Sequence, residues 1–133
     1  MANVYNRGKF LCISVDMDAL DVWGILLSTA FAFNVDHNVL SEISTSRLDT
    51  DLDLGVLTAN EDDTNDISWL DCGDPTWSAV AGGSTVAGFA VYREVGAEAS
   101  DELVCFIDTT DTATNGGDIT INISATEGFL KLT

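Results

Sequence analysis

Residues 115–133, NGGDITINISATEGFLKLT, hold two turn signals and two stretches of alternating polarity. From position 118 to 124 isoleucine occupies every second position, which is the period of a strand with one buried face. Gly116 and Gly128 stand where tight turns need positive φ angles. The pattern predicts a β-hairpin at the end of this sequence, and it predicts that five apolar side chains of the hairpin lie in the core: Ile119, Ile121, Ile123, Phe129 and Leu132.

Further strands are predicted upstream of this hairpin. Residues 22–29, VWGILLST, are rich in β-forming side chains, although Leu26 and Leu27 also fit a helical spacing that Gly24 disfavours. Residues 85–95 alternate, which places Val86 and Ala90 on one face and Phe89 and Val91 on the other. Residues 103–107 form a continuous apolar run of the kind buried on both faces of a sheet.

The chain as a whole is predicted to be mainly β. About seven or eight short strands separated by turn signals are typical of a β-sandwich or a jelly-roll-like barrel. Residues 10–13 fit either a short N-terminal helix or a strand. A length of 133 residues suits a single domain with a full core. Residues 1–9, which include Arg7 and Lys9, are predicted to form an N-terminal arm.

The charge balance narrows the classes of partner. The sequence has 22 Asp and Glu against five Lys and Arg, and its formal net charge is −17. A hydrophobic content of 46% argues against an intrinsically disordered chain, so the acidic side chains belong on the surface. Such a surface repels nucleic acid and anionic membranes, and neither is an expected partner. It favours solubility, cation binding or docking on a basic protein.

The three cysteines, Cys12, Cys72 and Cys105, lie far apart in the sequence. An odd number of cysteines is a poor disulfide framework, and we interpret them as buried thiols of a protein made in a reducing cytoplasm. A zinc site would need all three to converge on His37, the one histidine of the chain. The simpler interpretation is that the thiols pack in the core.

Asp49, Asp51 and Asp53 are weak candidates for a metal site. Their alternate spacing resembles the opening of a calcium loop, but the glycine comes one place late and Asn60 occupies the twelfth position, where the loop needs a glutamate. An exposed acidic strand face is the better interpretation, and we predict neither a metal nor another cofactor. No serine lies in a nucleophile-elbow motif, and no other catalytic motif is present. We therefore expect a protein that is not an enzyme.

Two tryptophans, Trp69 and Trp77, are candidates for interface contacts, because large aromatic side chains with a polar atom are favoured there. Core packing is the default for both. In a carbohydrate- or calcium-binding adhesion module, one of them would stack on a sugar while the aspartates held the ion. That module is an alternative function from a different class.

The order of several segments resembles that of a widespread family of small virion proteins from tailed bacteriophages. The likeness covers most of the chain, and the C-terminal stretch is its most specific part. The segments that carry it are YNRGKF (5–10), VWGILLST (22–29), VLSEI (39–43) followed by Arg47, VAGFAVY (86–92) followed by Gly96, LVCFID (103–108), NGGDIT (115–120) and GFLKL (128–132).

The resemblance implies a structural component of the virion with no active site. Its leading implication is a capsid decoration (cement) protein on the outer surface of the phage head, with the major capsid protein as partner and assembly in the host cytoplasm. Closed symmetry favours a homo-oligomer, a trimer or a dimer, on a local axis of the shell. Arg7 and Lys9 are then candidates for shell contacts. A neck, tail or baseplate component is the alternative within the same likeness.

Overall fold

The computed structural model describes residues 2–14, 16 and 19–133. The fold is mainly β, with 42% strand and one short N-terminal helix, as predicted. None of the sheets closes into a barrel, so the barrel alternative is wrong. The elements are β1 (Asn3–Val4), α1 (Asn6–Ser14), β2 (Val22–Ser28), the 3₁₀ helices η2 (Leu40–Glu42) and η3 (Ser44–Ser46), β3 (Leu52–Asp53), β4 (Thr58–Asp62), β5 (Ile67–Asp71), β6 (Thr76–Trp77), β7 (Thr85–Arg93), β8 (Glu102–Ala113), β9 (Ile119–Thr120) and β10 (Leu130–Leu132).

A five-stranded antiparallel sheet in the order β1-β8-β7-β2-β3 forms the centre of the molecule. Its long strands β2 and β7 lie where the sequence predicts strands, whereas β8 contains the predicted run 103–107 and continues past it to Ala113. Two smaller antiparallel sheets, β10-β5-β4 and β6-β9, complete the fold. The structure has more strands than predicted because β1, β3, β6 and β9 are each two residues long, too short to show a period.

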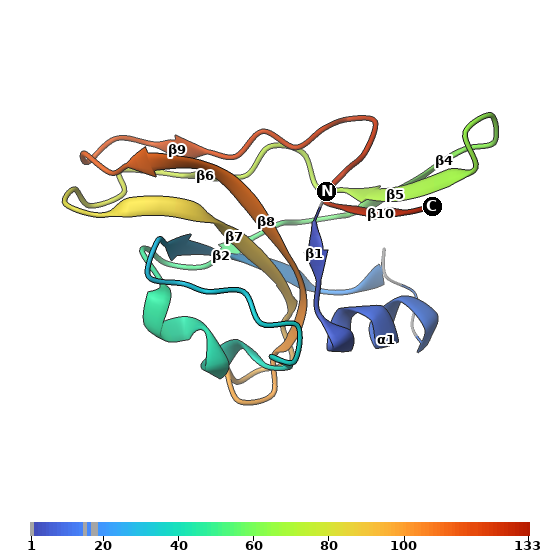
Figure 1. Ribbon diagram of the computed structural model, residues 1–133, viewed down its shortest axis with the longest axis horizontal. Helices are drawn as coiled ribbons and strands as arrows, with labels where there is room; N and C mark the ends of the chain where they lie inside the picture. Colours follow the sequence, from blue (N-terminus) through green and yellow to red (C-terminus); the bar gives the residue numbers. More distant parts are fainter. Residues whose placement is uncertain (1, 15, 17–18) are drawn as a thin grey trace.

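The central sheet is buried on both faces, which explains why its strands are almost continuously apolar. On one face, β7 and β8 pack against the smaller sheets and Leu11 of α1, around Phe89 and Trp77. On the other face, Tyr5, Leu40 and Ile43 cover the sheet, and Phe31 and Phe33 lie at the margin of this second core. Figure 1 shows the smaller sheets on one side of β7 and β8 and the segment that contains the 3₁₀ helices on the other.

A β-bulge changes the faces predicted for β7. In the ladder to β2, Gly88 and Val86 pair with the consecutive residues Leu27 and Ser28, so Ala87 is an extra residue in β7. Strict alternation places Val86 with Ala90, but Val86 lies in the same core cluster as Phe89, on the opposite face. An extra residue in one strand of an antiparallel pair reverses the direction of every side chain beyond it.

The predicted C-terminal hairpin is wrong in its pairing. Strand β9 pairs with β6, and β10 pairs with β5, so the two predicted partners belong to different sheets. The strand predicted over 118–124 is only two residues long. Beyond it, the backbone of Ile121 donates a hydrogen bond to Pro75 O at 3.0 Å. Each half of the stretch therefore pairs with an earlier part of the chain, which the local alternation of the sequence does not reveal.

The predicted core residues of this stretch divide into three groups. Ile119, Ile121 and Phe129 are buried, as expected. Ile123 is partly buried and packs against the core cluster. The prediction for Leu132 is wrong, because its side chain is 55% exposed. It lies opposite Ser68 at the end of β10, an edge strand, whereas Leu130 in the same strand reaches the core.

Residues 1–9 do not form a free arm over their described part. Asn3 and Val4 pair with β8, and the backbone of Tyr5 donates to Val104 O at 3.1 Å. The side chain of Tyr5 is fully buried. A Cβ atom added at Gly8 would meet the backbone of Val104, so glycine allows α1 to approach the central sheet closely.

The cysteines form no disulfide. Cys105 is buried in the core, whereas Cys12 and Cys72 are half-buried at its margin, so the interpretation as fully buried thiols holds for Cys105 only. Burial, reinforced by nearby Asp71, raises the pKa of Cys72 to about 12. No helix within the described residues has the length and apolar character needed to cross a membrane.

Candidate functional site

One edge of the longest strand, β8, is only partly paired. Strand β1 covers it at Cys105 and Phe106 and does not extend further along the ladder. Beyond this point no strand of the described chain lies on this edge of β8. On its other edge Ile107, Asp108, Thr112 and Ala113 pair with β7, whereas residues 109–111 bulge out of the ladder. An uncovered strand edge carries backbone groups that can pair with another chain.

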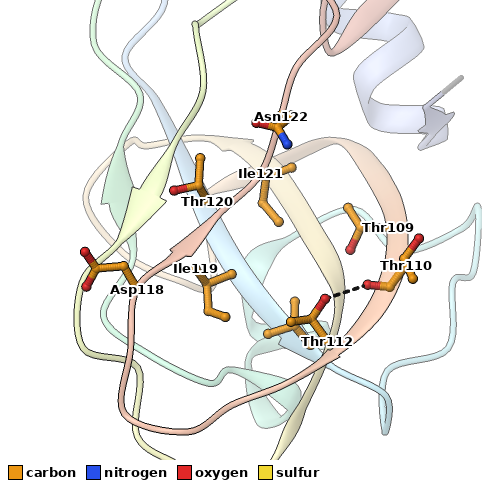
Figure 2. A pocket seen from close by; sticks show the side chains of 9 residues that line it. Thr109, Thr110, Thr112, Asp118, Ile119, Thr120, Ile121 and Asn122 are labelled. Atoms are coloured by element: carbon orange, nitrogen blue, oxygen red, sulfur yellow. Dashed lines mark hydrogen bonds between the residues drawn. The ribbon is translucent and has the colours of Figure 1, made fainter.

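A pocket of about 400 Å³ lies beside this uncovered edge. Threonines of β8 form one wall, and the segment from Asp118 to Asn122, which includes β9, forms the other (Figure 2). Strand β9 pairs with β6 on one side only, so its other edge is also without a strand in the described chain. The pocket is lined by Val86, Thr109, Thr110, Thr112, Asp118, Ile119, Thr120, Ile121 and Asn122.

A second pocket, of about 190 Å³, extends the first along β8 towards β1. The two share Asn122, and Ile107 and Asp108 of the second directly precede the threonines of the first. We call the two pockets together the β8 groove. The second pocket is lined by Ala2, Ile107, Asp108, Asn122, Ile123, Ser124, Glu127, Gly128, Phe129 and Lys131.

Polar side chains of the groove divide into those with partners and those without. The hydroxyl of Thr112 donates to Thr110 O at 3.0 Å, as drawn in Figure 2, and that of Thr109 donates to Ala87 O at 3.2 Å. Asp118 Oδ1 accepts a hydrogen bond from the backbone of Ala79 at 2.9 Å. The side chains of Thr110 and Asn122 form no hydrogen bond with another described residue. They are exposed and are available to a ligand.

The groove is negatively charged. Asp108, Asp118 and Glu127 line it, and the one cation in its lining, Lys131, is bound to Glu127 at 2.8 Å. The hydrogen bond and the charge of Lys131 hold the pKa of Glu127 below its usual value. Among the described residues of the lining, a ligand therefore meets carboxylates, hydroxyls and an amide, and no Lys or Arg without an ion pair.

The five cations of the chain are almost all held within the molecule. Arg7 and Arg93 both bind Glu102. Arg47 binds Asp51 at 2.8 Å and Glu98 at 2.6 Å. Lys131 binds Glu127, which leaves Lys9 as the cation without an ion pair in the described chain.

The interface candidates lie in different environments. Lys9 is exposed on α1, but Arg7 is bound to Glu102 and lies over the ring of Phe10. Trp69 is half-buried on β5, and its Nε1 atom has no hydrogen-bond partner. Trp77 is only 3% exposed and packs edge-on against Phe89, so the prediction that it serves as an interface residue is wrong.

The three weak metal candidates do not converge. Asp51 binds Arg47 and accepts a hydrogen bond from the hydroxyl of Tyr92 at 2.9 Å. Asp53 Oδ1 accepts from the backbone of Gly55, and Asp49 Oδ1 from that of Thr50. Over residues 2–14, 16 and 19–133, no group of three or more His, Cys, Asp or Glu side chains is arranged to hold a metal ion.

No local sequence pattern predicts the β8 groove. Its walls come from β8 and from the segment around β9, which belong to different sheets. The one local signal is the polar run of residues 109–112, TTDT, which ends an otherwise apolar strand. A core strand that becomes polar before it ends indicates that its second half leaves the core.

Glu102 joins the N-terminal helix to the central sheet. Its side chain is 12% exposed and binds both Arg7 and Arg93. Burial by itself raises the carboxyl pKa, but the hydrogen bonds and charges of the two arginines outweigh burial and hold the pKa below its usual value. The carboxylate therefore stabilises the folded state above the unfolded-state pKa and loses this effect as the pH falls through the folded-state pKa.

We expect Glu102→Gln to lower the free energy of unfolding at pH 7 by about 1 to 3 kcal/mol, the usual range for hydrogen bonds to charged groups. Below about pH 4.5 the difference from the wild type should shrink, because the wild-type carboxyl is then protonated more readily in the unfolded state. Urea denaturation at a series of pH values measures this. Glu61→Gln, which removes an exposed carboxylate without an ion pair in the described chain, is the control. Wild-type and Glu102→Gln profiles that stay parallel would contradict the assignment.

Comparison of the chain with protein-family models, with curated protein sequences and with solved structures gave no significant match.

Proposed function

We propose that this protein is a structural subunit of a bacteriophage virion. In the proposed role it is a capsid decoration (cement) protein that binds the major capsid protein from outside the head and stabilises the shell. The resemblance of its sequence to small tailed-phage virion proteins suggests this role. The distribution of charge in the structure supports the mode of docking.

The observation that carries the proposal is the internal pairing of the cations. Four of the five, Arg7, Arg47, Arg93 and Lys131, bind carboxylates of the same molecule. A surface with a net charge of −17 and few free cations is complementary to a basic surface. The proposed contact therefore places acidic faces of this protein against basic groups of the shell.

The structure changes the part assigned to the N-terminal segment. Arg7 is held by Glu102 and is not a free docking charge. Lys9 and the neighbouring Phe10, which is 49% exposed, are two residues of α1 that a partner can reach. In the proposal, α1 gives a small contact beside the larger acidic surface.

On a lattice of identical sites, weak individual contacts are enough to hold an oligomer on the shell. Once one subunit of a homo-oligomer has docked, the next contact is intramolecular, and avidity can exceed a single affinity by about 10²-fold or more. A trimer or a dimer on a local symmetry axis would have this advantage. The proposal therefore requires moderate affinity at each site and a copy number that matches the shell.

The test is to count copies of the protein in purified particles by quantitative mass spectrometry and to locate it by electron microscopy. We expect hundreds of copies on the outer surface of the head and progressive release as the salt concentration rises, because salt screens exposed charges. A dozen or fewer copies at the neck or tail would assign it to that part of the virion instead. Its absence from particles would overturn the proposal.

A further inference from the structure

We propose that the β8 groove binds an extended, lysine- or arginine-bearing segment of a partner protein, which adds a strand along residues 107–113. This inference deepens the proposed function, since it rests on docking to a basic partner and names the element that docks. It concerns a surface that is open in the described chain.

The backbone of β8 has an edge that is open to strand pairing. On the open edge, the ladder of β1 stops at Phe106, and the strand continues for seven residues to Ala113. Strand addition to such an edge gives affinity through main-chain hydrogen bonds, while side-chain pockets give specificity. The uncovered length is comparable to an ordinary strand of about five or six residues, and it carries a bulge at residues 109–111.

The position of the second wall makes the edge a groove. Residues 118–122 lie across the pocket from the threonines of β8, with Ile119 and Ile121 directed towards them and Asp118 and Thr120 directed to the opposite side (Figure 2). An inserted strand would place alternate side chains towards the two walls. It would meet the free hydroxyl of Thr110 and the free amide of Asn122 as hydrogen-bonding groups.

The carboxylates that line the β8 groove favour an occupant with basic side chains. The lining holds Asp108, Asp118 and Glu127, and Lys131 is already bound to Glu127. A second copy of this chain would bring few basic side chains to these carboxylates, because Lys9 is the one Lys or Arg without an ion pair in the described chain. A strand with basic side chains at alternate positions pairs with these carboxylates, so we commit to that occupant.

The probe is a synthetic peptide of alternating lysine and threonine, about nine residues long, which spans about 30 Å at 3.3 Å per residue. A second peptide has the same sequence with every second backbone nitrogen methylated, which keeps the charge and removes strand hydrogen bonds. Both are titrated into the isotope-labelled full chain, and backbone amide shifts are followed by NMR. We expect the first peptide to shift amides of residues 107–113 and 118–124, and the methylated peptide to bind at least about tenfold more weakly.

A matched pair of variants locates the site. Thr110→Lys adds a positive charge to the groove, and Thr64→Lys adds the same charge at an exposed position in the turn after β4. We expect Thr110→Lys to raise the Kd of the unmethylated peptide about tenfold or more and Thr64→Lys to change it less than about threefold, since an interfacial like charge is costly and a remote one is not. Thermal unfolding of both variants verifies that each is folded.

Three results would overturn the inference. One is equal binding of both peptides with shifts spread over the acidic surface, including residues 61–66, which would show general charge attraction. Another is the absence of binding. The third is self-association that Thr110→Lys abolishes, which would assign the groove to a second copy. The proposed function is judged separately: if Thr110→Lys protein occupies phage heads as fully as the wild type, the function stands and the groove is not the docking site.

Discussion

Removal of residues 128–133 is expected to abolish cooperative folding. The deletion removes β10 together with Phe129 and Leu130, which are 2% and 3% exposed, and the hydrogen bond from the backbone of Phe129 to Leu70 O at 2.9 Å. Loss of two buried side chains costs about 2 to 5 kcal/mol each, and native domains are stable by only about 5 to 15 kcal/mol. Circular dichroism and thermal unfolding of the shortened chain measure the result.

The control is removal of residues 132 and 133 only. Leu132 is 55% exposed, and Thr133 is also exposed, so this shorter deletion should leave the protein folded with nearly the wild-type melting temperature. Comparison of the two deletions shows whether the loss of folding comes from the absence of β10 or from shortening of the chain. A folded, cooperative protein without residues 128–133 would show that β5 does not need the strand beside it.

Phe89→Ala is expected to cause a large loss in the free energy of unfolding. Phe89 is fully buried in β7 and packs against Trp77 with ring centroids 5.8 Å apart, where β6 crosses the central sheet. Truncating a buried phenylalanine to alanine costs about 3 to 5 kcal/mol through lost burial and the cavity that remains. Denaturant titration followed by tryptophan fluorescence gives the change in the free energy of unfolding.

The same substitution at a surface position is the matched control. Phe10 is 49% exposed, and its ring lies under the guanidinium of Arg7 at 4.7 Å. Phe10→Ala should therefore cost about 1 kcal/mol or less, the size of an exposed cation–π contact. Similar losses for the two variants would contradict the position of Phe89 at the centre of the core.

The sequence predicted the long strands well because their signal is local. Continuous apolar runs in β2 and β8 and the alternating run in β7 follow from burial of the sheet on both faces. The two-residue strands β1, β3, β6 and β9 have no such signal, since a period of two cannot be read from two residues. The prediction of an N-terminal arm was wrong because it rested on the polar side chains of the segment. Tyr5 and Gly8 contact β8, which is distant in sequence, and local polarity does not reveal these contacts.

The candidate site depended on contacts that no local pattern contains. Residues 118–122 lie opposite Thr109 and Thr110 only because β9 pairs with β6 in a sheet beside the central one. The charge of the surface was predictable from composition, but the pairing of Arg7 with Glu102 and of Arg47 with Glu98 was not, because these residues lie far apart in the sequence. Trp77 illustrates the same limit, since its burial follows from the position of β6 over Phe89.

Residues 115–133 show which properties follow from the sequence and which depend on the tertiary structure. By itself the sequence determined that the stretch is extended, that its turns fall at glycines, and that Ile119, Ile121 and Phe129 are buried, because these properties follow from side-chain polarity and backbone conformation. Tertiary structure alone decided the partners: β9 joins β6, β10 joins β5, and Leu132 remains exposed. The physical reason is that alternation fixes which face of a strand is apolar, whereas the choice of neighbouring strand depends on packing of the whole core.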